Sequence, residues 1–188
     1  MQESCEVEVK ARVPSAAEAE GMVLRAGGSF VREGLQEDVY LRHPCRDLKA
    51  RDEALRLRRE GGACVIAFKG RREGGAAKMR EEVEVKADTF DEALAIFERL
   101  GFAPAYAIAK RRREFRLGAA TVVVDSVEGL GNFIEVEVKA GGGAGAFDAA
   151  KKELFSVTDR LGIRREMLIT DSYLELLASR SSDSSAER

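Results

Sequence analysis

The sequence predicts an α+β fold in which about eight antiparallel strands close into a barrel, with the helices packed outside it. The pentapeptide Glu-Val-Glu-Val-Lys occurs at Glu6–Lys10, Glu82–Lys86 and Glu135–Lys139. Read as a strand, each copy places two glutamates and a lysine on one face and two valines on the other. Segments with strand periodicity also outnumber helical segments, and their order along the chain repeats.

Composition bounds the class of protein. The chain has 188 residues, of which 45% are hydrophobic and 34% charged, enough for one domain with a core. The net charge is −2 and the pI is near 5.7, which argues against a general nucleic-acid binder. No apolar run reaches the length of a membrane span and no signal-peptide pattern is present, so we expect a cytoplasmic protein without membrane contact.

The first half of the chain reads as a strand, a helix and three strands. Glu3–Val13 alternates as a strand does, and Pro14 and Ser15 then begin a helix that ends at Gly27 and Gly28. The Gly61-Gly62 pair is typical of a tight hairpin. The three strands are expected near Leu35–Arg42, Ala54–Glu60 and Ala63–Gly70.

The second half repeats that order. Met79–Ala87 is a strand that contains the second pentapeptide, and a helix with apolar residues at helical spacing then ends at Gly101. Three strands follow, near Ala105–Leu117, Ala119–Val127 and Asn132–Ala140. The repeated order indicates an internal duplication, with the third pentapeptide strand completing the barrel.

The C-terminal part is expected to be helical and then polar. Gly141–Gly145 is a flexible break before a helix near Phe147–Leu161, and a short helix is expected at Asp171–Leu177. Residues 179–188 are polar and are predicted to be disordered. The sequence therefore predicts one domain over residues 1–178, built from two similar halves, and a polar tail.

Charged residues occupy the face of each strand opposite its apolar residues, and in a closed barrel they would line the interior. Carboxylates bind magnesium or manganese through oxygen, while arginine and lysine bind phosphate oxygens. The mixed lining therefore predicts a site for an inorganic or organic triphosphate that is held together with one or two divalent ions. The residues on this face are Glu6, Glu8, Lys10, Arg56, Arg58, Lys69, Arg80, Glu82, Glu84, Lys110, Arg112, Glu114, Asp125, Glu135 and Glu137.

Other interpretations of these residues stay open. The charges could pair only with one another, although buried ion pairs are costly, or an open sheet could leave them in solvent. The basic run Lys110–Arg113 could bind nucleic acid, but a strand would point only half of it to one surface. The three cysteines suggest no disulfide framework, and His43 and Cys45 lack a second pair of zinc ligands.

The same residues resemble the signatures of the CYTH superfamily, the triphosphate tunnel enzymes. The resemblance covers roughly residues 3–178 and, within the superfamily, is closest to class IV adenylyl cyclase-like proteins. The segments Gln36–Tyr40, His43–Asp47, Asp52–Arg58 and Asp171–Leu177 are similar to that class. The superfamily motifs match at Glu6-x-Glu8-x-Lys10, Arg56-x-Arg58, Lys69, Arg80-x-Glu82-x-Glu84, Lys110-x-Arg112, Asp125 and Glu135-x-Glu137.

The resemblance implies an eight-stranded antiparallel tunnel and a role for each matched residue. The implied metal ligands, for Mg²⁺ or Mn²⁺, are Glu6, Glu8, Glu135 and Glu137, assisted by Glu82, Glu84 and Asp125. The implied triphosphate-binding residues are Lys10, Arg56, Arg58, Lys69, Arg80, Lys110 and Arg112. The implied catalytic residues are Lys10, Tyr40 and Asp125. A homodimer is also implied.

Three functions remain open at this stage. In an adenylyl cyclase the ribose 3′-hydroxyl of ATP attacks the α-phosphorus, and pyrophosphate leaves. In a triphosphatase acting on inorganic, thiamine or nucleoside triphosphate, water attacks the terminal phosphorus, with Lys10 and Tyr40 helping to activate it. A binding module would hold a triphosphate without turnover. The segments similar to the class IV proteins favour the cyclase.

Overall fold

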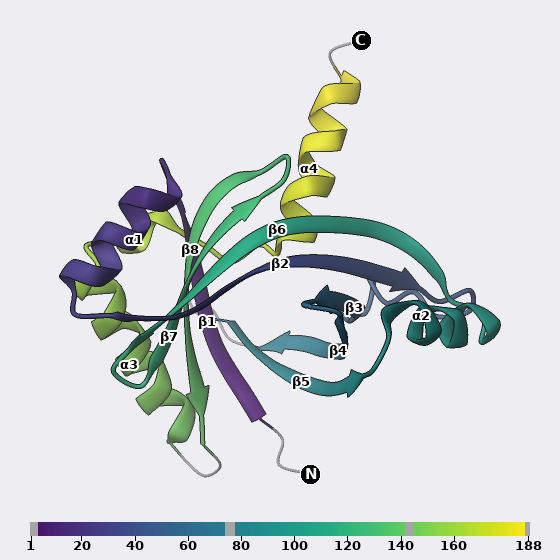
Figure 1. Ribbon diagram of the computed structural model, residues 1–188, viewed down its shortest axis with the longest axis horizontal. Helices are drawn as coiled ribbons and strands as arrows, with labels where there is room; N and C mark the ends of the chain where they lie inside the picture. The colour runs from purple at the N-terminus through teal and green to yellow at the C-terminus, as the bar shows by residue number, and fades with distance from the viewer. Residues whose placement is uncertain (1–3, 74–77, 142–144, 187–188) are drawn as a thin grey trace.

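The computed structural model describes residues 4–73, 78–141 and 145–186 (Figure 1). For residues 4–6, 73, 78–80 and 181–186 this description is limited to the backbone. The order of strand, helix and three strands occurs twice, as expected. The elements are β1 (Ser4–Val13), α1 (Ala16–Arg25), β2 (Ser29–Arg42), β3 (Ala54–Glu60), β4 (Ala63–Glu73), β5 (Lys78–Ala87), α2 (Phe90–Arg99), β6 (Ala103–Leu117), β7 (Ala120–Val127), β8 (Gly131–Ala140), α3 (Ala146–Arg160), a 3₁₀ turn (Arg165–Met167), β9 (Leu168–Ile169) and α4 (Tyr173–Ala186).

The prediction of a closed eight-stranded barrel is wrong. The strands form one curled, nine-stranded antiparallel sheet in the order β5-β4-β3-β2-β6-β7-β8-β1-β9, whose end strands β5 and β9 are not paired with each other in the described residues. Instead β5 pairs with β1 over Ser4–Glu8, while β9 pairs with β1 at Lys10 and Ala11. Strand β8 occupies one edge of β1, and β5 and β9 divide the other edge between them. No continuous ladder along the whole of β1 therefore closes the sheet into a barrel.

The first and third pentapeptides lie side by side in antiparallel register. Lys10 is opposite Glu135, Glu8 is opposite Glu137, and Glu6 is opposite Lys139. The repeat therefore pairs with itself, so that a lysine of one copy faces the leading glutamate of the other. The second copy lies in β5 and pairs with the N-terminal part of β1, where Glu82 is opposite Ser4.

Helices cover the valine face of the sheet only in part (Figure 1). Helices α1 and α3 pack on β1, β7 and β8, where Val7, Val9 and Val136 are buried in the main core. Helix α2 packs on β3 and β4. It therefore leaves Val83 and Val85 of the second pentapeptide 49% and 58% exposed, and here the expected helix cover fails.

Local signals set the helix ends. The Ser15 hydroxyl accepts a hydrogen bond from the Glu18 amide at 3.2 Å, which caps the start of α1. Gly27 and Gly101 follow α1 and α2 with φ of +86° and +91°, a conformation that glycine adopts without strain. No helix in the described ranges is long and apolar enough to cross a membrane.

The main differences from the expected elements concern β2, β9 and α4. Strand β2 begins at Ser29 because its pairing with β6 continues past a register shift between Phe30 and Arg32. The two-residue strand β9 was not expected. Helix α4 continues to Ala186, within the segment expected to be a polar tail, and the domain boundary at residue 178 stays a prediction.

Candidate functional site

A cavity of about 1140 Å³ lies on the concave side of the sheet. Its lining brings together most of the charged residues that the alternation predicted, from six strands. They are Glu8, Lys10, Arg56, Arg58, Lys69, Glu82, Glu84, Lys110, Arg112, Glu114, Glu135 and Glu137, and Tyr40 lines the same cavity. The side chains of Glu6 and Arg80, a predicted metal ligand and a predicted triphosphate-binding residue, lie outside the described part of the structure.

Lys10 and Glu135 form a buried ion pair on the cavity wall. The Lys10 Nζ lies 3.1 Å from Glu135 Oε1, and the two side chains are 4% and 6% exposed. Burial favours the neutral amine, but the carboxylates of Glu135 and Glu8 outweigh it and raise the pKa of Lys10. Burial likewise opposes ionisation of Glu135, but Lys10 and Arg112 hold its pKa well below the usual range. In this arrangement Lys10 is an ammonium donor.

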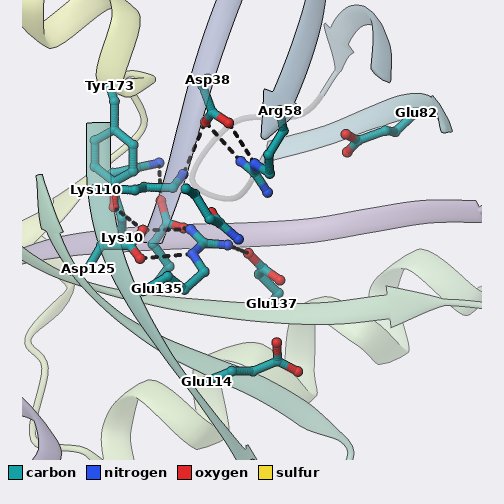
Figure 2. A network of polar contacts seen from close by, with 12 residues as sticks. Lys10, Asp38, Arg58, Glu82, Lys110, Glu114, Asp125, Glu135, Glu137 and Tyr173 are labelled. Atoms are coloured by element: carbon teal, nitrogen blue, oxygen red, sulfur yellow. Dashed lines mark hydrogen bonds and ion pairs between the residues drawn. The ribbon is translucent and has the colours of Figure 1, made fainter. Parts of the chain in front are cut away.

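The carboxylates of Asp125, Glu135 and Glu137 lie near one another (Figure 2). Arg112 connects all three. It donates to both oxygens of Asp125 at 2.8 and 2.6 Å and to Glu135 at 2.6 Å, and it lies 3.7 Å from Glu137. Asp125 has no exposed surface and is not part of the cavity lining. Asp125, expected to be catalytic, therefore lies behind Arg112, and its catalytic role stays a prediction.

Asp38 holds two further cations, and the residue-by-residue prediction missed it. Arg58 donates to both Asp38 oxygens at 2.6 and 2.9 Å, and Lys110 Nζ lies 3.3 Å from Oδ2. Asp38 is 2% exposed, and although burial opposes ionisation, Lys110 and Arg58 lower its pKa. The available signal was the alternation of Gln36, Asp38 and Tyr40, which puts all three on one face of β2.

Burial sets the direction of the pKa shift of Lys110 and of Tyr40, whereas at Lys10 the neighbouring carboxylates outweigh it. Burial, followed by the charge of Arg112, lowers the pKa of Lys110 to about 8, with Asp38 opposing the shift. Burial raises the pKa of the Tyr40 phenol, and the nearby Arg56 opposes this only in part. Tyr40 therefore remains a hydrogen-bond donor near neutral pH rather than a proton acceptor.

A second charged cluster lies on β3, β4 and β5. Figure 2 shows its member Glu82 apart from Asp125, Glu135 and Glu137. Lys69 Nζ donates to Glu82 at 2.8 Å, and Arg56 Nη2 lies 3.5 Å from Glu82 and 3.2 Å from Glu84. The buried Nε of Arg56 has no hydrogen-bond partner. Because a buried donor without an acceptor is costly, this atom suits an anionic ligand. Glu82 and Glu84 thus lie among cations and not beside Glu135.

The basic run from Lys110 to Arg113 divides between the two faces of β6, as predicted. Lys110 and Arg112 line the cavity, whereas Arg111 and Arg113 form ion pairs with Glu33. Arg113 also pairs with Glu20 of α1.

The carboxylates of β1 and β8 offer oxygen donors of the kind a divalent ion binds, but within the described residues no three potential ligands are gathered closely enough to hold a metal ion. Glu8 and Glu137 face each other directly across the ladder, and Glu135 lies on the same face of β8. Like charges placed directly opposite destabilise a sheet unless a cation lies near them. Carboxylate oxygens are the ligands that magnesium and manganese prefer. The metal assignment stays a prediction.

The C-terminal segment supplies residues that the sequence interpretation did not single out. Tyr173, at the start of α4, donates a hydrogen bond to Asp125 Oδ2 at 3.0 Å. Glu175 accepts two hydrogen bonds from Arg72 of β4, at 2.9 and 2.7 Å, and Arg72 also lies 2.7 Å from Asp52. The segment Asp171–Leu177 was noted only for its overall similarity, since a helix start gives no sign of which distant strand it will meet.

Comparison with known proteins decides the family. The CYTH domain model matches residues 4–173. The chain belongs to the CYTH domain family. Among curated relatives, "Putative adenylate cyclase MJ0240" of Methanocaldococcus jannaschii is 33% identical over 91% of this chain and 97% of its own length. "Adenylate cyclase CyaB" of Aeromonas hydrophila is 29% identical over 78% of this chain and 74% of its own length.

Solved structures share the fold of this CYTH protein. The PH1819 protein of Pyrococcus horikoshii superposes with a TM-score of 0.82 at 33% identity, covering 93% of this chain and 99% of its own. "Putative adenylyl cyclase HpAC1" from Hippeastrum, described as revealing a dominant triphosphatase activity, has a TM-score of 0.70 at 19% identity. That comparison covers 94% of this chain and 95% of the other.

Proposed function

We propose that this CYTH protein is a metal-dependent enzyme that acts on a triphosphate bound in the cavity. We further propose a reaction of the class IV adenylyl cyclase type, in which ATP gives cyclic AMP and pyrophosphate. The observation that supports the proposal most directly is the convergence of Lys10, Lys110 and Arg112 on one cavity whose wall also contains Glu135 and Glu137. The cyclase names of the two curated relatives favour this reaction.

The cations are suited to bind phosphate oxygens. Lys10 and Lys110 are 4% and 5% exposed, so a phosphate that reaches them leaves bulk water and gains strong charge-assisted hydrogen bonds. Arg58 and Arg56 lie on the same face of β3, and their planar guanidinium groups can each donate two hydrogen bonds to one phosphate. Lys69 extends this surface onto β4. A chain of three phosphates can therefore be contacted along its length.

The acidic residues have separate proposed roles. Glu8, Glu135 and Glu137 would hold the divalent ion, whereas Glu82 and Glu84, which were predicted to assist, pair with Lys69 and Arg56 and would orient those cations. A metal bound there would supply charge that stabilises the reacting phosphate and lowers the pKa of the attacking hydroxyl. Asp125 would position Arg112, because it is fully buried behind that guanidinium. Tyr40 would donate a hydrogen bond to the substrate.

The second candidate is a triphosphatase. The structure of similar fold from Hippeastrum is described as having a dominant triphosphatase activity despite its cyclase name. The side chains that form the site contact phosphate oxygens in either reaction, so the same cavity could direct water to the terminal phosphorus.

Product analysis tests both candidates. The protein is incubated with Mg²⁺ or Mn²⁺ and, separately, ATP, thiamine triphosphate and tripolyphosphate. Cyclic AMP with pyrophosphate is the expected result. Orthophosphate without a cyclic product would replace the cyclase with the triphosphatase. Tight binding of a triphosphate without any product would leave a binding module, and the proposed enzyme would be wrong.

A pair of variants separates the site from the scaffold. Glu137→Gln removes one carboxylate charge from the cavity wall, and Glu98→Gln makes the same change on the exposed surface of α2. Turnover should fall by at least about tenfold in the first variant and stay unchanged in the second. Equal activities would contradict the role given to the β8 carboxylates.

A further inference from the structure

We propose that Tyr173 is a positioning residue that holds Lys10, Lys110 and Asp125 in the arrangement that receives the triphosphate. The inference rests on the proposed function and adds to it a residue of the C-terminal segment. Tyr173 is the first residue of α4, and Figure 2 shows its side chain extending from that helix toward the two lysines and Asp125.

The aromatic ring lies against both lysines. The Lys10 Nζ is 5.2 Å from the ring centroid, and the Lys110 Nζ is 5.3 Å from it. These lysines come from β1 and β6, which are not neighbours in the sheet. A cation within about 6 Å of an aromatic ring centroid is attracted to the electron-rich face of the ring. One side chain therefore orients two ammonium groups from separate strands.

The hydroxyl of the same residue fixes the carboxylate behind the site. It donates to Asp125 Oδ2 at 3.0 Å, and Asp125 in turn accepts two hydrogen bonds from Arg112. Burial, with the charges of Glu135 and Asp125, raises the pKa of the Tyr173 phenol well above its ordinary value. The phenol therefore remains a donor. Tyr173 thus contacts two of the predicted phosphate-binding residues directly and a third, Arg112, through Asp125.

Contacts on both sides hold Tyr173 in place. Before it in the chain, β9 pairs with β1 beside Lys10 itself, with Ile169 opposite Lys10. After it, Glu175 binds Arg72 of β4 and accepts hydrogen bonds from the amide and hydroxyl of Ser172. The Tyr173 ring packs edge-on against Phe133, with centroids 5.0 Å apart. The ring is 7% exposed, so its orientation is set before a ligand arrives.

The orientation of the two lysines by Tyr173 matters because it exists before the triphosphate binds. Cations that are already oriented do not lose side-chain freedom when the phosphates bind, and this raises affinity without any new contact to the ligand. Tyr173 itself needs no contact with the substrate for this effect, which distinguishes a positioning residue from a catalytic one.

The experiment uses the full-length protein and separates the ring from the hydroxyl. Tyr173→Phe keeps the ring and removes the hydrogen bond to Asp125, whereas Tyr173→Leu removes both. Phe155→Leu is the control, because it removes a buried ring that is not part of the cavity lining and whose face is covered by the Arg165 guanidinium. Calorimetry measures tripolyphosphate binding in EDTA, where no turnover occurs. Product formation with Mg²⁺ then gives kcat and KM, and thermal unfolding gives Tm.

In the wild type, tripolyphosphate should bind; absence of binding would count against the proposed function itself, before any variant is compared. Given binding, Tyr173→Leu should weaken it by about tenfold or more, since two cation–ring contacts are lost. Tyr173→Phe should restore affinity to within about threefold of wild type and mainly lower kcat. The control should lower Tm and leave binding unchanged. If Tyr173→Leu binds tripolyphosphate as the wild type does, or if Phe155→Leu weakens binding equally at the same loss of Tm, Tyr173 is not a positioning residue.

Discussion

Lys10 and Glu135 face each other across the β1–β8 ladder and form an ion pair with Nζ and Oε1 3.1 Å apart. Both residues come from copies of one pentapeptide, the first from its last position and the second from its first position. Antiparallel pairing of two identical segments brings these ends together. The sequence repeat therefore creates a buried pair of opposite charges, and the site is built around it.

Removing the negative partner of that pair should destabilise the fold. Glu135→Gln leaves the Lys10 ammonium buried without its closest counter-charge, and breaking a buried ion pair in this way costs about 3 kcal/mol or more. Urea unfolding at pH 7 measures the change in the free energy of unfolding. The exposed Glu98→Gln variant on α2 should remain within about 0.5 kcal/mol of wild type. A similarly small effect for Glu135→Gln would show that the pair contributes little.

The hydrogen bonds between Glu175 and Arg72 should make stability depend on acid pH. Burial would raise the pKa of Glu175, but Arg72 and Ser172 outweigh it and lower the pKa to about 2, from an ordinary value near 4.5. A depressed carboxyl pKa contributes stability that is complete above the unfolded-state pKa and is lost as pH falls toward the folded-state pKa.

We therefore expect the stability difference between wild type and Glu175→Gln to be constant above about pH 5. It should shrink between pH 4.5 and pH 2. Urea titrations at successive pH values measure that difference. If the stability difference stays the same down to pH 2, the contact with Arg72 does not lower the pKa of Glu175 in the way described.

Triphosphate affinity should weaken above about pH 8, because the pKa of Lys110 is lowered to about 8 while that of Lys10 is raised. Above that pH the Lys110 amine loses its proton and its attraction for phosphate. Calorimetry with tripolyphosphate in EDTA between pH 7 and pH 9.5 measures the change. Lys110→Arg keeps a permanent charge at the same position and should flatten the profile. If the affinities of the wild type and of Lys110→Arg fall in parallel as pH rises, the pH dependence comes from titration of tripolyphosphate and not of Lys110.

A divalent ion should raise the Tm of the wild type but not of the double variant Glu8→Gln/Glu137→Gln. The two glutamates are directly opposite on β1 and β8, and an ion that binds only the folded protein stabilises it in proportion to its affinity. Thermal unfolding with 5 mM Mn²⁺ and with EDTA measures the shift, and Glu98→Gln should shift as the wild type does. An undiminished shift in the double variant would place the ion elsewhere.

Alternation along single strands predicted most of the cavity lining. Glu8, Lys10, Arg112 and Glu135 all point into the cavity because the side-chain period of a strand is two, and this holds whatever the strand pairs with. The same rule predicted that Lys110–Arg113 would divide between two faces. Asp38 was missed although it obeys the rule, because a single acid between Gln36 and Tyr40 does not stand out in a sequence so rich in charge.

The sequence by itself determined the order of eight strands along the chain, their charged face and most of the residues that compose it, since these follow from local periodicity and from the turn residues between strands. The tertiary structure alone decided how the sheet ends and which charges meet. The two-residue strand β9 takes the edge of β1 beside Lys10, so β5 pairs with only part of β1, and the predicted closed barrel gives way to a curled nine-stranded sheet. The chain that follows β9 brings Tyr173 to Asp125. Contacts between residues 48 positions apart depend on the packing of whole elements, which no local period encodes.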